Sequence, residues 1–385
     1  MKRITAVLLC VILLANSLSG CSYGEEVQAK NMPSEDVLAG QMKPTDAEDI
    51  ENEEKDTEDE QIDKALAAVR GESGDIDYSS VKNLQLEAGS HIAVVVKSAK
   101  TGYWATVQKG MEAAVAELNE ELGYKGNDKI YFTYEGSTQE DDVETQINII
   151  DAVLSENPAV LCLAAIDMDS CGAQLETAAE NGIPVIALDS GVNSDILQTI
   201  CSTDNYQAGV EAARRLCTAI GDNGEVAAIA HNLHSQSSEE REQGFREEIA
   251  DNHPNVTIVD VSYENEEESV KDMVETVLTT YPNLAGYFCT SESVTSKLLE
   301  SMMIYPDKMI AIVGFDAGKE QISAIREGTE VGSVVQNSYG MGYATIVAAV
   351  RAASGLLNDT CINSGYQWVD KENIENPEYE NYLYE

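Results

Sequence analysis

The chain of 385 residues has 24 basic residues against 68 acidic ones, which gives a formal net charge of −44 at pH 7. A surface this acidic repels the phosphate backbone of nucleic acids, so we exclude nucleic-acid binding. The shortage of lysine and arginine also argues against attachment to anionic lipid through basic residues.

The N-terminus has the organisation of a secretory signal peptide. Two basic residues precede an apolar run, Ile4–Leu14, which has about half the length that a bilayer-spanning helix needs. The string Leu18-Ser19-Gly20-Cys21 follows. It resembles the lipobox of bacterial lipoproteins, which implies cleavage after residue 20 and a lipid anchor on the Cys21 thiol. The alternative is an ordinary signal peptide with an incidental cysteine.

Residues 21–88 are predicted to form a disordered acidic tether. Asp46–Glu60 is almost continuous acid, and such a stretch cannot bury enough apolar surface to offset the entropy of ordering it. Like charges also extend it. The tether would hold a globular domain away from the membrane, and the alternative is an acidic motif that recruits a partner. A weak helical pattern at Ile62–Val69 precedes the domain.

The cysteines and histidines give no support for a metal site. Two of the eight cysteines lie at or before the lipidation position. The other six have no CxxC spacing and lie mostly in or beside apolar segments, which favours buried free thiols, although export permits a disulfide. His231 and His234 are three residues apart without a nearby acidic or cysteine partner, so we predict ordinary histidines. We predict no metal and no cofactor.

From His91 onward, short apolar runs alternate with amphipathic stretches. Ile92–Val96 is β-branched, and Val107–Leu122 places its apolar residues on one helical stripe. Strands separated by helices of ten to fifteen residues indicate parallel sheets covered on both faces. The roughly 290 residues of this part of the chain are many for one such sheet, so we predict two α/β lobes. The further predicted strands are Ile130–Tyr134, Val160–Ala164, Pro184–Leu188, Glu225–Ala230, Val256–Val261, Gly286–Cys289 and Met309–Val313; the further helices are Asp142–Ser155, Gly172–Asn181, Tyr206–Ile220, Ser238–Asn252, Glu267–Thr280, Val294–Met303 and Lys319–Glu327.

Ligands of parallel sheets bind beyond the carboxyl ends of the strands, so the segments directly after strands are candidate site segments. In this chain they are consistently polar or aromatic. They are Lys97–Trp104, Ala164–Asp169, Leu188–Gly191, Ser202–Asn205, Ser237–Phe245, Cys289–Glu292, Val313–Asp316 and Val334–Asn337.

This series resembles the ribose- and galactose-type substrate-binding proteins of ABC importers, which have the periplasmic-binding-protein-like fold of type I. The resemblance runs from His91 to about Asn373. It implies an α/β fold of two similar three-layer α/β/α lobes with parallel sheets, joined by three hinge crossovers, with the ligand cleft between them. The lobes would comprise residues 89–203 plus 337–364 and residues 204–336 plus 365–385. The crossovers would lie near Thr203–Asn205, Gln336–Asn337 and Ser364, and hinge closure would trap the ligand.

The resemblance also implies a set of ligand-binding residues. Tyr103 and Trp104 match two aromatics that sandwich a sugar ring, and the alternative for them is core packing. Asp189 and Asp316 match carboxylates that accept hydrogen bonds from sugar hydroxyls. Arg241 matches a donor to ring and hydroxyl oxygens, and the alternative is a surface ion pair.

Four further positions complete the resemblance. Asn205 and Gln336, at two crossovers, can donate and accept hydrogen bonds at once, as hydroxyls do. Phe315 would form a wall of the cleft beside Asp316. Asp167 sits where several branches of the superfamily have a ligand carboxylate.

The chain departs from the ribose-binding pattern in four places. Ser190 replaces the arginine that usually follows the first aspartate, and Ser291, with Glu292 beside it, replaces an amide. Thr101 replaces an asparagine, and Lys97 replaces a small residue. A lysine there also occurs in receptors for autoinducer-2. A site built for hydroxyls rejects mismatched ligands strongly, so these changes argue against ribose itself.

The function implied is that of a monomeric, extracytoplasmic, lipid-anchored solute-binding protein that delivers a small sugar or polyol to an ABC permease. The alternative is a receptor of the same fold, for example for autoinducer-2 or a sugar, that signals to a sensor kinase or chemoreceptor. An enzyme is not expected, because no GxSxG, Walker or strand-linked GxGxxG motif is present. A LacI-type repressor would need a DNA-binding headpiece where this chain has a signal peptide and an acidic tether.

Overall fold

The computed structural model of the chain describes residues 59–265 and 268–384. The predicted signal peptide, the predicted lipidation site Cys21 and the most acidic part of the predicted tether lie outside these residues. Within the described part of the chain, none of the helices has the length and apolar character that a membrane crossing requires.

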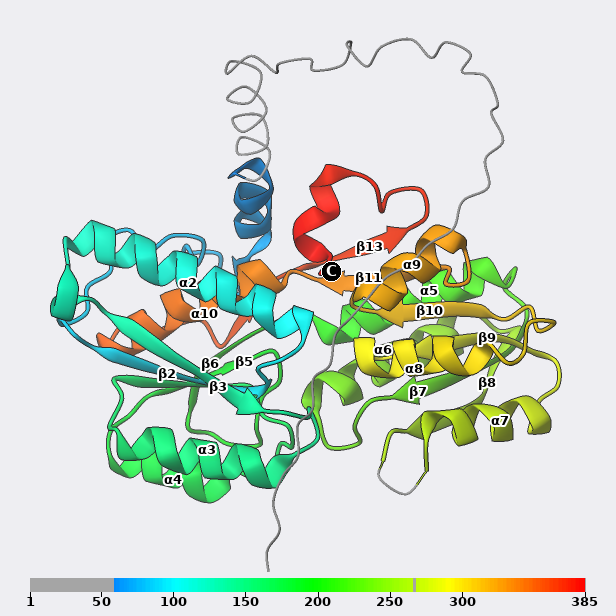
Figure 1. Cartoon of the computed structure of the whole chain (residues 1–385), viewed down its shortest axis with the longest axis horizontal. Helices are drawn as coiled ribbons and strands as arrows, with labels where there is room; N and C mark the ends of the chain where they lie inside the picture. The colour runs from blue at the N-terminus through cyan, green and yellow to red at the C-terminus, as the bar shows by residue number, and fades with distance from the viewer. Residues whose placement is uncertain (1–58, 266–267, 385) are drawn as a thin grey trace, which may run out of the picture. The chain divides into compact units, whose positions relative to one another are not determined.

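The first sheet has seven strands in the order β1-β12-β6-β5-β4-β2-β3 (Figure 1). All its neighbours pair in parallel except β1 with β12. The strands are β1 (Arg70–Gly71), β2 (His91–Ser98), β3 (Tyr131–Ser137), β4 (Val160–Leu163), β5 (Val185–Leu188), β6 (Leu197–Ser202) and β12 (Cys361–Asn363). The helices packed with this sheet are α2 (Gly102–Leu122), α3 (Val143–Ser155), α4 (Gly172–Glu180) and α10 (Ser338–Ala353), and a short 3-10 helix, η1 (Gly126–Asp128), follows α2.

Strand β2 shows why this sheet is covered on both faces. Successive side chains of a strand point to opposite faces. Ile92, Val94 and Val96 belong to the apolar cluster that contains α2 and α10, whereas Ala93 and Val95 belong to the cluster that contains α3 and α4. A continuous apolar run is therefore what this central parallel strand needs.

The second sheet has six strands in the order β13-β11-β10-β9-β7-β8, and only the β11–β13 pair is antiparallel. Its apolar clusters contain residues of α5 and α6, of α7 and α8, and of α9. The strands are β7 (Gly224–Ala230), β8 (Val256–Tyr263), β9 (Leu284–Cys289), β10 (Ala311–Phe315), β11 (Gly332–Gln336) and β13 (Tyr366–Asp370). The helices are α5 (Asn205–Ala219), α6 (Gln236–Asn252), α7 (Val270–Thr280), α8 (Glu292–Met302), α9 (Lys319–Glu327) and the 3-10 helix η2 (Pro377–Tyr382).

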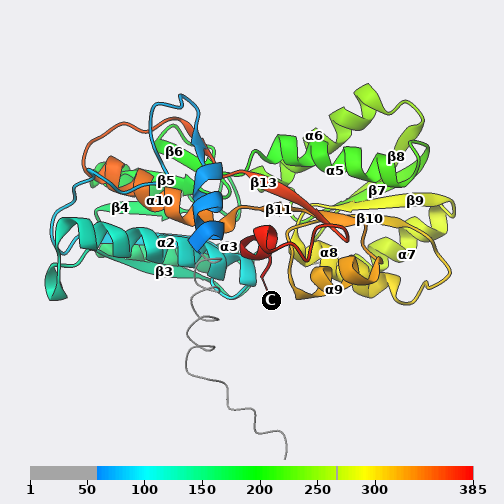
Figure 2. The same ribbon diagram turned by 90° about the horizontal axis from the view of Figure 1, so that it is seen from above.

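The chain passes between the two sheets three times. It leaves the first sheet after β6, returns to it after β11 through α10, and leaves it again after β12 to form β13 beside β11 (Figure 2). We call the first sheet with its helices the first lobe and the second sheet with its helices the second lobe. Two mostly parallel α/β layers joined in this way confirm the predicted fold class.

Two glycines let α5 and α6 approach each other closely. A Cβ atom on Gly209 would lie 2.1 Å from the backbone oxygen of Arg241, and one on Gly244 would lie 2.0 Å from the backbone oxygen of Tyr206. Backbone contact at this distance leaves no room for a side chain. The contact fixes the position of Arg241 on α6 relative to α5.

The predicted tether is wrong over its described part. Residues 59–68 are helical, β1 pairs with β12, and Val69, Tyr78 and Val81 are buried in the apolar cluster of the first lobe. These apolar residues are few and irregularly spaced, and they pack against strands and helices distant in sequence. Apart from the weak helical pattern at Ile62–Val69, which the helix over residues 59–68 confirms, no local pattern distinguishes this stretch from a solvated linker.

Asn337 joins three segments where the chain returns to the first lobe. Its Nδ2 donates to the backbone oxygens of Ala65 (2.6 Å) and Ser364 (2.8 Å), and its Oδ1 accepts from the backbone N–H of Gly340 (3.0 Å) as the N-cap of α10. We expect Asn337→Ala to lower the free energy of unfolding by about 2–4 kcal/mol, because it removes a cap and leaves buried carbonyl groups unpaired.

Urea unfolding followed by circular dichroism measures this loss. Asn193→Ala is the control, because Asn193 is exposed and its side chain bonds another exposed residue, Asp169 of the loop after β4; it should change stability by less than about 0.5 kcal/mol. Equal stabilities for the two variants would show that residue 337 does not tie these segments together.

Candidate functional site

Polar side chains of both lobes meet beyond the carboxyl ends of β2 and β5. The ammonium group of Lys97, on β2, lies 3.1 Å from Asp189 Oδ2 and donates to Ser235 Oγ of the second lobe at 3.2 Å. Tyr103 donates its hydroxyl to Asp189 Oδ1 at 2.7 Å. Ser190 Oγ lies 3.2 Å from Ser235 Oγ. The first network therefore combines a cation, a carboxylate and three hydroxyls, and it spans the two lobes.

A second network surrounds Arg241, which is 2 % exposed. Its guanidinium donates to Asn205 Oδ1 (2.9 Å), to the backbone oxygen of Thr290 (2.8 Å) and to Gln336 Oε1 (3.0 Å). The same group lies 3.6 Å from the centroid of the Phe315 ring. Such contacts fix the guanidinium in one orientation, so Arg241 is a buried, oriented donor and not part of a surface ion pair.

Gln336 connects this network to the second carboxylate. Its Nε2 donates to Asp316 Oδ1 at 2.9 Å, and its Oε1 also accepts from Thr203 Oγ1 at 2.8 Å. Thr203 and Gln336 lie where the chain passes between the lobes, so the crossover segments themselves contribute to the networks.

The two aspartates occupy equivalent positions in the two lobes. Asp189 directly follows β5 with φ = 61°, and Asp316 directly follows β10 with φ = 69°. The left-handed region is uncommon for residues other than glycine, although aspartate and asparagine tolerate it better than most. Both backbone N–H groups are bonded to neighbouring strands, to Cys201 O and Val334 O. The same local turn therefore places one carboxylate at the end of a strand in each lobe.

Burial shifts the pKa values of several groups here. It raises the pKa of Asp316, helped by the charge of Asp189, while Arg241 and the hydrogen bond from Gln336 act in the opposite direction. Burial and Asp189 raise the pKa of Tyr103 well above its usual value. Burial, followed by Lys97 and Arg241, lowers the pKa of His231. Hydrogen bonds to charged groups held away from water are strong and selective.

The aromatic pair does not form the predicted sandwich in this structure. Trp104 is 1 % exposed and donates Nε1–H to Glu140 Oε1 at 3.0 Å. The rings of Tyr103 and Trp104 contact each other edge to face, with centroids 4.9 Å apart and an interplanar angle of 79°. Two rings that enclose a sugar would face each other across a gap. Binding of a sugar by Tyr103 and Trp104 stays a prediction.

The remaining predicted ligand-binding residues differ in whether their side chains already have hydrogen-bond partners. Among the described residues, the buried hydroxyl oxygens of Thr101 and Ser291 have no hydrogen-bond partner, and buried polar atoms normally have one. Asp167 instead accepts from the backbone N–H of Asp169 (2.9 Å) and from Ser170 Oγ (2.7 Å) within its own loop. Thr101 and Ser291 thus have free bonding capacity, whereas the bonds of Asp167 stabilise a turn.

Sequence reasoning missed four residues beside these networks: Glu140, Ser235, Glu292 as an acidic neighbour of Asp316, and Tyr384. Glu140 follows β3, so inspection of the segments after strands could have found it. Ser235 lies directly before α6, two residues ahead of the candidate segment Ser237–Phe245. No local pattern points to Tyr384, which is next to the C-terminus.

Glu292 gives the site a measurable pH dependence. Burial, with Asp316 and other carboxylates nearby, raises its pKa to about 8. Between the unfolded pKa near 4.5 and about 8 the folded protein binds the extra proton, so stability falls as pH rises through this range. We expect Glu292→Gln to flatten this slope in denaturant titrations at pH 5, 6, 7 and 8. Glu300→Gln, at an exposed position of the same helix, should leave the wild-type slope; identical slopes in all three proteins would contradict this assignment.

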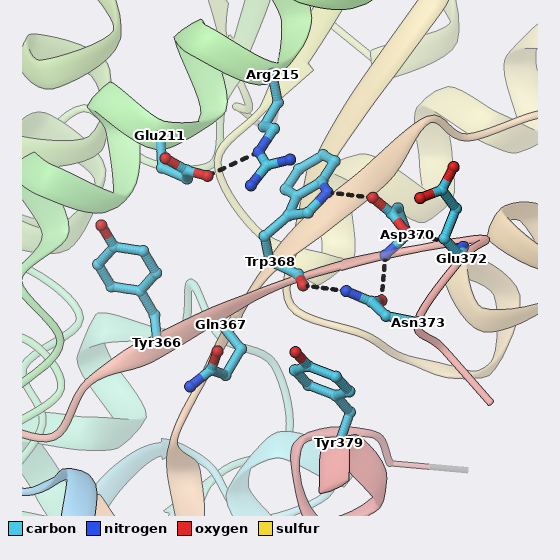
Figure 3. Close-up of a pocket in the computed structure, with 9 residues that line it drawn as sticks. All are labelled: Glu211, Arg215, Tyr366, Gln367, Trp368, Asp370, Glu372, Asn373 and Tyr379. Atoms are coloured by element: carbon cyan, nitrogen blue, oxygen red, sulfur yellow. Dashed lines mark hydrogen bonds and ion pairs between the residues drawn. The ribbon is translucent and has the colours of Figure 1, made fainter. Parts of the chain in front are cut away.

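A separate cavity of about 480 Å³ lies against β13, and none of its lining residues is a predicted site residue (Figure 3). Its tryptophan, Trp368, packs under the Arg215 guanidinium at 4.9 Å and donates to Asp370 at 2.7 Å. Glu211 accepts from Arg215. Within this cavity the Trp368 ring, the Arg215 guanidinium and the Glu211 carboxylate thus already contact one another. The two networks described above therefore remain the candidate site.

Comparisons with known proteins agree with the fold of two α/β lobes. A family model described as periplasmic binding protein domain matches residues 92–357. The ribose import binding protein RbsB of Haemophilus influenzae is 22 % identical over 264 residues, which cover 69 % of this chain and 86 % of that protein. The xylitol-binding protein of Mycolicibacterium smegmatis is 20 % identical over 240 residues, which cover 61 % and 67 %.

Among solved structures, an ABC transporter solute-binding protein from Agrobacterium vitis with bound D-fucose matches with a TM-score of 0.67 and 26 % identity, covering 77 % of this chain and all of that one. The family and all three of these proteins are described as binding proteins, and two of the three belong to import or transport systems, which confirms the prediction that the chain is not an enzyme. The chain belongs to the periplasmic-binding-protein domain family.

Proposed function

We propose that the protein is a monomeric, lipid-anchored solute-binding protein outside the cytoplasm that captures a small sugar or polyol between its two lobes and delivers it to an ABC permease. The observation that carries this proposal is the pairing of two buried aspartates, one per lobe, with the buried cations Lys97 and Arg241. Family membership and the relatives that bind ribose, xylitol and D-fucose support the same ligand class.

The chemistry of the networks suits neutral polyhydroxylated ligands. A hydroxyl group donates one hydrogen bond and accepts others, and the site offers both charged acceptors and charged donors. Asp189 and Asp316 would accept from hydroxyls, while Lys97 and Arg241 would donate to hydroxyl or ring oxygens. Lys97 and Ser190 distinguish this site from the ribose-binding pattern, so a sugar or polyol other than ribose is proposed.

Contacts across the two lobes support capture by closure. Lys97 and Ser190 of the first lobe both reach Ser235 of the second, and Met168 donates its backbone N–H to His234 O at 3.0 Å. Hinge closure would form these contacts only when the lobes approach. A ligand held between the lobes would be released when they separate.

A thermal-shift screen tests the ligand class. Panels of pentoses, hexoses, their 6-deoxy forms and alditols should contain at least one compound that raises the melting temperature in a saturable way, because binding to the native state stabilises it. Amino acids and nucleosides serve as comparison panels. A rise with an amino acid or nucleoside, and none with any sugar or alditol, would overturn the proposal.

The anchor is tested by Cys21→Ala. Without the thiol no lipid can be attached, so we expect the protein to move from the membrane fraction to the soluble fraction and to lose incorporation of labelled palmitate. Cys361→Ala is the control, because Cys361 is an exposed cysteine of the folded part and should not affect fractionation. Continued labelling of Cys21→Ala would refute lipidation at that position.

A further inference from the structure

The C-terminal segment passes from one lobe to the other at the candidate site. Tyr382, in η2, is buried in the apolar cluster of the second lobe that contains Ile322 and Val335. Tyr384, two residues later, is buried in the apolar cluster of the first lobe together with Tyr103. The last described residue of the chain therefore lies between the lobes and not on the outer surface.

Tyr384 contacts both lobes at the same time. On the first lobe its ring centroid lies 6.2 Å from that of Tyr103, and a Cβ atom on Gly102 would lie 2.9 Å from its ring. On the second lobe its hydroxyl accepts from the backbone N–H of Ala317 at 3.3 Å, and its own N–H donates to Ala317 O at 3.2 Å. Its hydroxyl therefore bonds the residue that directly follows Asp316, and it interacts electrostatically with the Asp316 carboxylate.

The segment that carries Tyr384 is braced from its other side. Gln61 donates to Glu380 Oε2 at 3.2 Å, and Lys64 lies 3.9 Å from Glu378 Oε1. Figure 1 shows the described helical segment 59–68, in blue, near the C-terminal segment in red. These contacts hold η2 in place, so Tyr384 extends from an anchored helix and not from a free end.

We propose that Tyr384 is a positioning residue of the sugar site, which fixes the backbone directly after Asp316 through its bonds to Ala317 and closes the wall beside Tyr103 with its ring. This inference rests on the proposed function. The two bonds to Ala317 restrict the backbone that carries the Asp316 carboxylate, and Gln336 holds the same carboxylate from its side chain. The ring occupies space that Gly102 leaves open. The affinity for a sugar and the choice among sugars would then depend on a residue at the extreme C-terminus.

The charge around Asp316 makes the role of the hydroxyl measurable. Burial raises the pKa of Asp316, and the nearby Tyr384 hydroxyl acts in the opposite direction. Removal of this hydroxyl should therefore raise the pKa of Asp316. As the pH is lowered, Asp316 would then be protonated earlier, and sugar affinity should be lost at a higher pH than in the wild type. The other titratable or charged groups that act on Asp316 are Arg241, Asp189, Tyr103, Glu140 and Glu292.

The test uses Tyr384→Phe and Tyr384→Ala in the full chain, with Tyr382→Phe as the control because it removes a buried hydroxyl from the same segment on the second-lobe side. The probe is whichever pentose, hexose or alditol of the screen saturates the wild type. We expect Tyr384→Phe to weaken its binding roughly 5- to 30-fold and to move the acid limb of the affinity profile to higher pH. Tyr384→Ala should weaken binding further and change the preference between epimeric sugars, whereas Tyr382→Phe should leave all three measurements unchanged.

A measurement without sugar separates this inference from the proposed function. The amide hydrogen of Ala317 should exchange faster in Tyr384→Phe than in the wild type, because its acceptor is gone. If exchange is faster but no sugar or alditol saturates the wild type, the proposed function fails and the placement of Tyr384 stands. If a sugar saturates the wild type and both Tyr384 variants bind it equally well over the whole pH range, the inference about Tyr384 is overturned and the proposed function stands.

Discussion

Replacement of Arg241 by alanine should reduce sugar affinity by about 30-fold or more. Arg241 is buried, and its guanidinium bonds Asn205, Thr290 and Gln336 while it stacks on Phe315. Truncation of a buried, hydrogen-bonded charge typically costs about 2–5 kcal/mol, and about 1.4 kcal/mol corresponds to a factor of ten in Kd. Isothermal titration calorimetry with the sugar that saturates the wild type measures the loss.

Two further variants show whether the orientation of the guanidinium matters. Arg241→Lys keeps the charge but lacks the planar fork of donors, so it should remain at least about tenfold weaker than the wild type. Arg246→Ala is the control on the same helix, because Arg246 forms an exposed pair with Glu242, and such pairs contribute about 0.2–1 kcal/mol. Wild-type affinity in Arg241→Ala would remove this residue from the site. Circular dichroism must show that each variant is folded.

The second large effect concerns the two aspartates. We expect Asp189→Asn and Asp316→Asn each to weaken sugar binding by about 1.5–3 kcal/mol, which is the contribution of a hydrogen bond to a charged group. Asparagine tolerates the left-handed backbone at both positions, so the loss would report the carboxylate and not backbone strain. Alanine would mix the two effects.

Asp222→Asn is the matched control. Asp222 also has a positive φ, 56°, but its side chain is about half exposed and bonds His253 at the far end of α5. The Asp222→Asn variant should bind sugar with the affinity of the wild type. If all three variants bind equally, the carboxylates that follow β5 and β10 take no part in binding.

The alternation of apolar runs and amphipathic stripes was sufficient to predict the fold class, because central parallel strands are buried on both faces and their covering helices on one. It failed at α10. Nearly every residue of α10 through Val350 is buried, so no polar face marks the helix, and Gly340 and Gly342 lower its helix propensity. It also failed at residues 59–88, whose partners are distant in sequence.

The site was predictable in part for a related reason. Asp189 and Asp316 follow the predicted strands Pro184–Leu188 and Met309–Val313, and the rule that ligands bind there finds such residues without tertiary information. Gln336 ends β11, which the apolar pattern did not predict, so only the family resemblance pointed to it. The bonds from Lys97 and Ser190 to Ser235 join residues of different lobes, and their distances depend on how the lobes approach. The edge-to-face contact of Tyr103 with Trp104 depends on side-chain rotamers, which periodicity does not reveal. Tyr384 reaches the site only through the path of the last segment.

The central claim is that one carboxylate from each lobe binds the sugar between them. Calorimetric titration of the double variant Asp189→Asn/Asp316→Asn tests it most directly, with the sugar or alditol that saturates the wild type. The claim predicts no measurable saturation of the folded double variant at about 100 times the wild-type Kd, because two charged acceptors are lost together. Saturation of the double variant with the wild-type Kd would place the sugar elsewhere and contradict the claim.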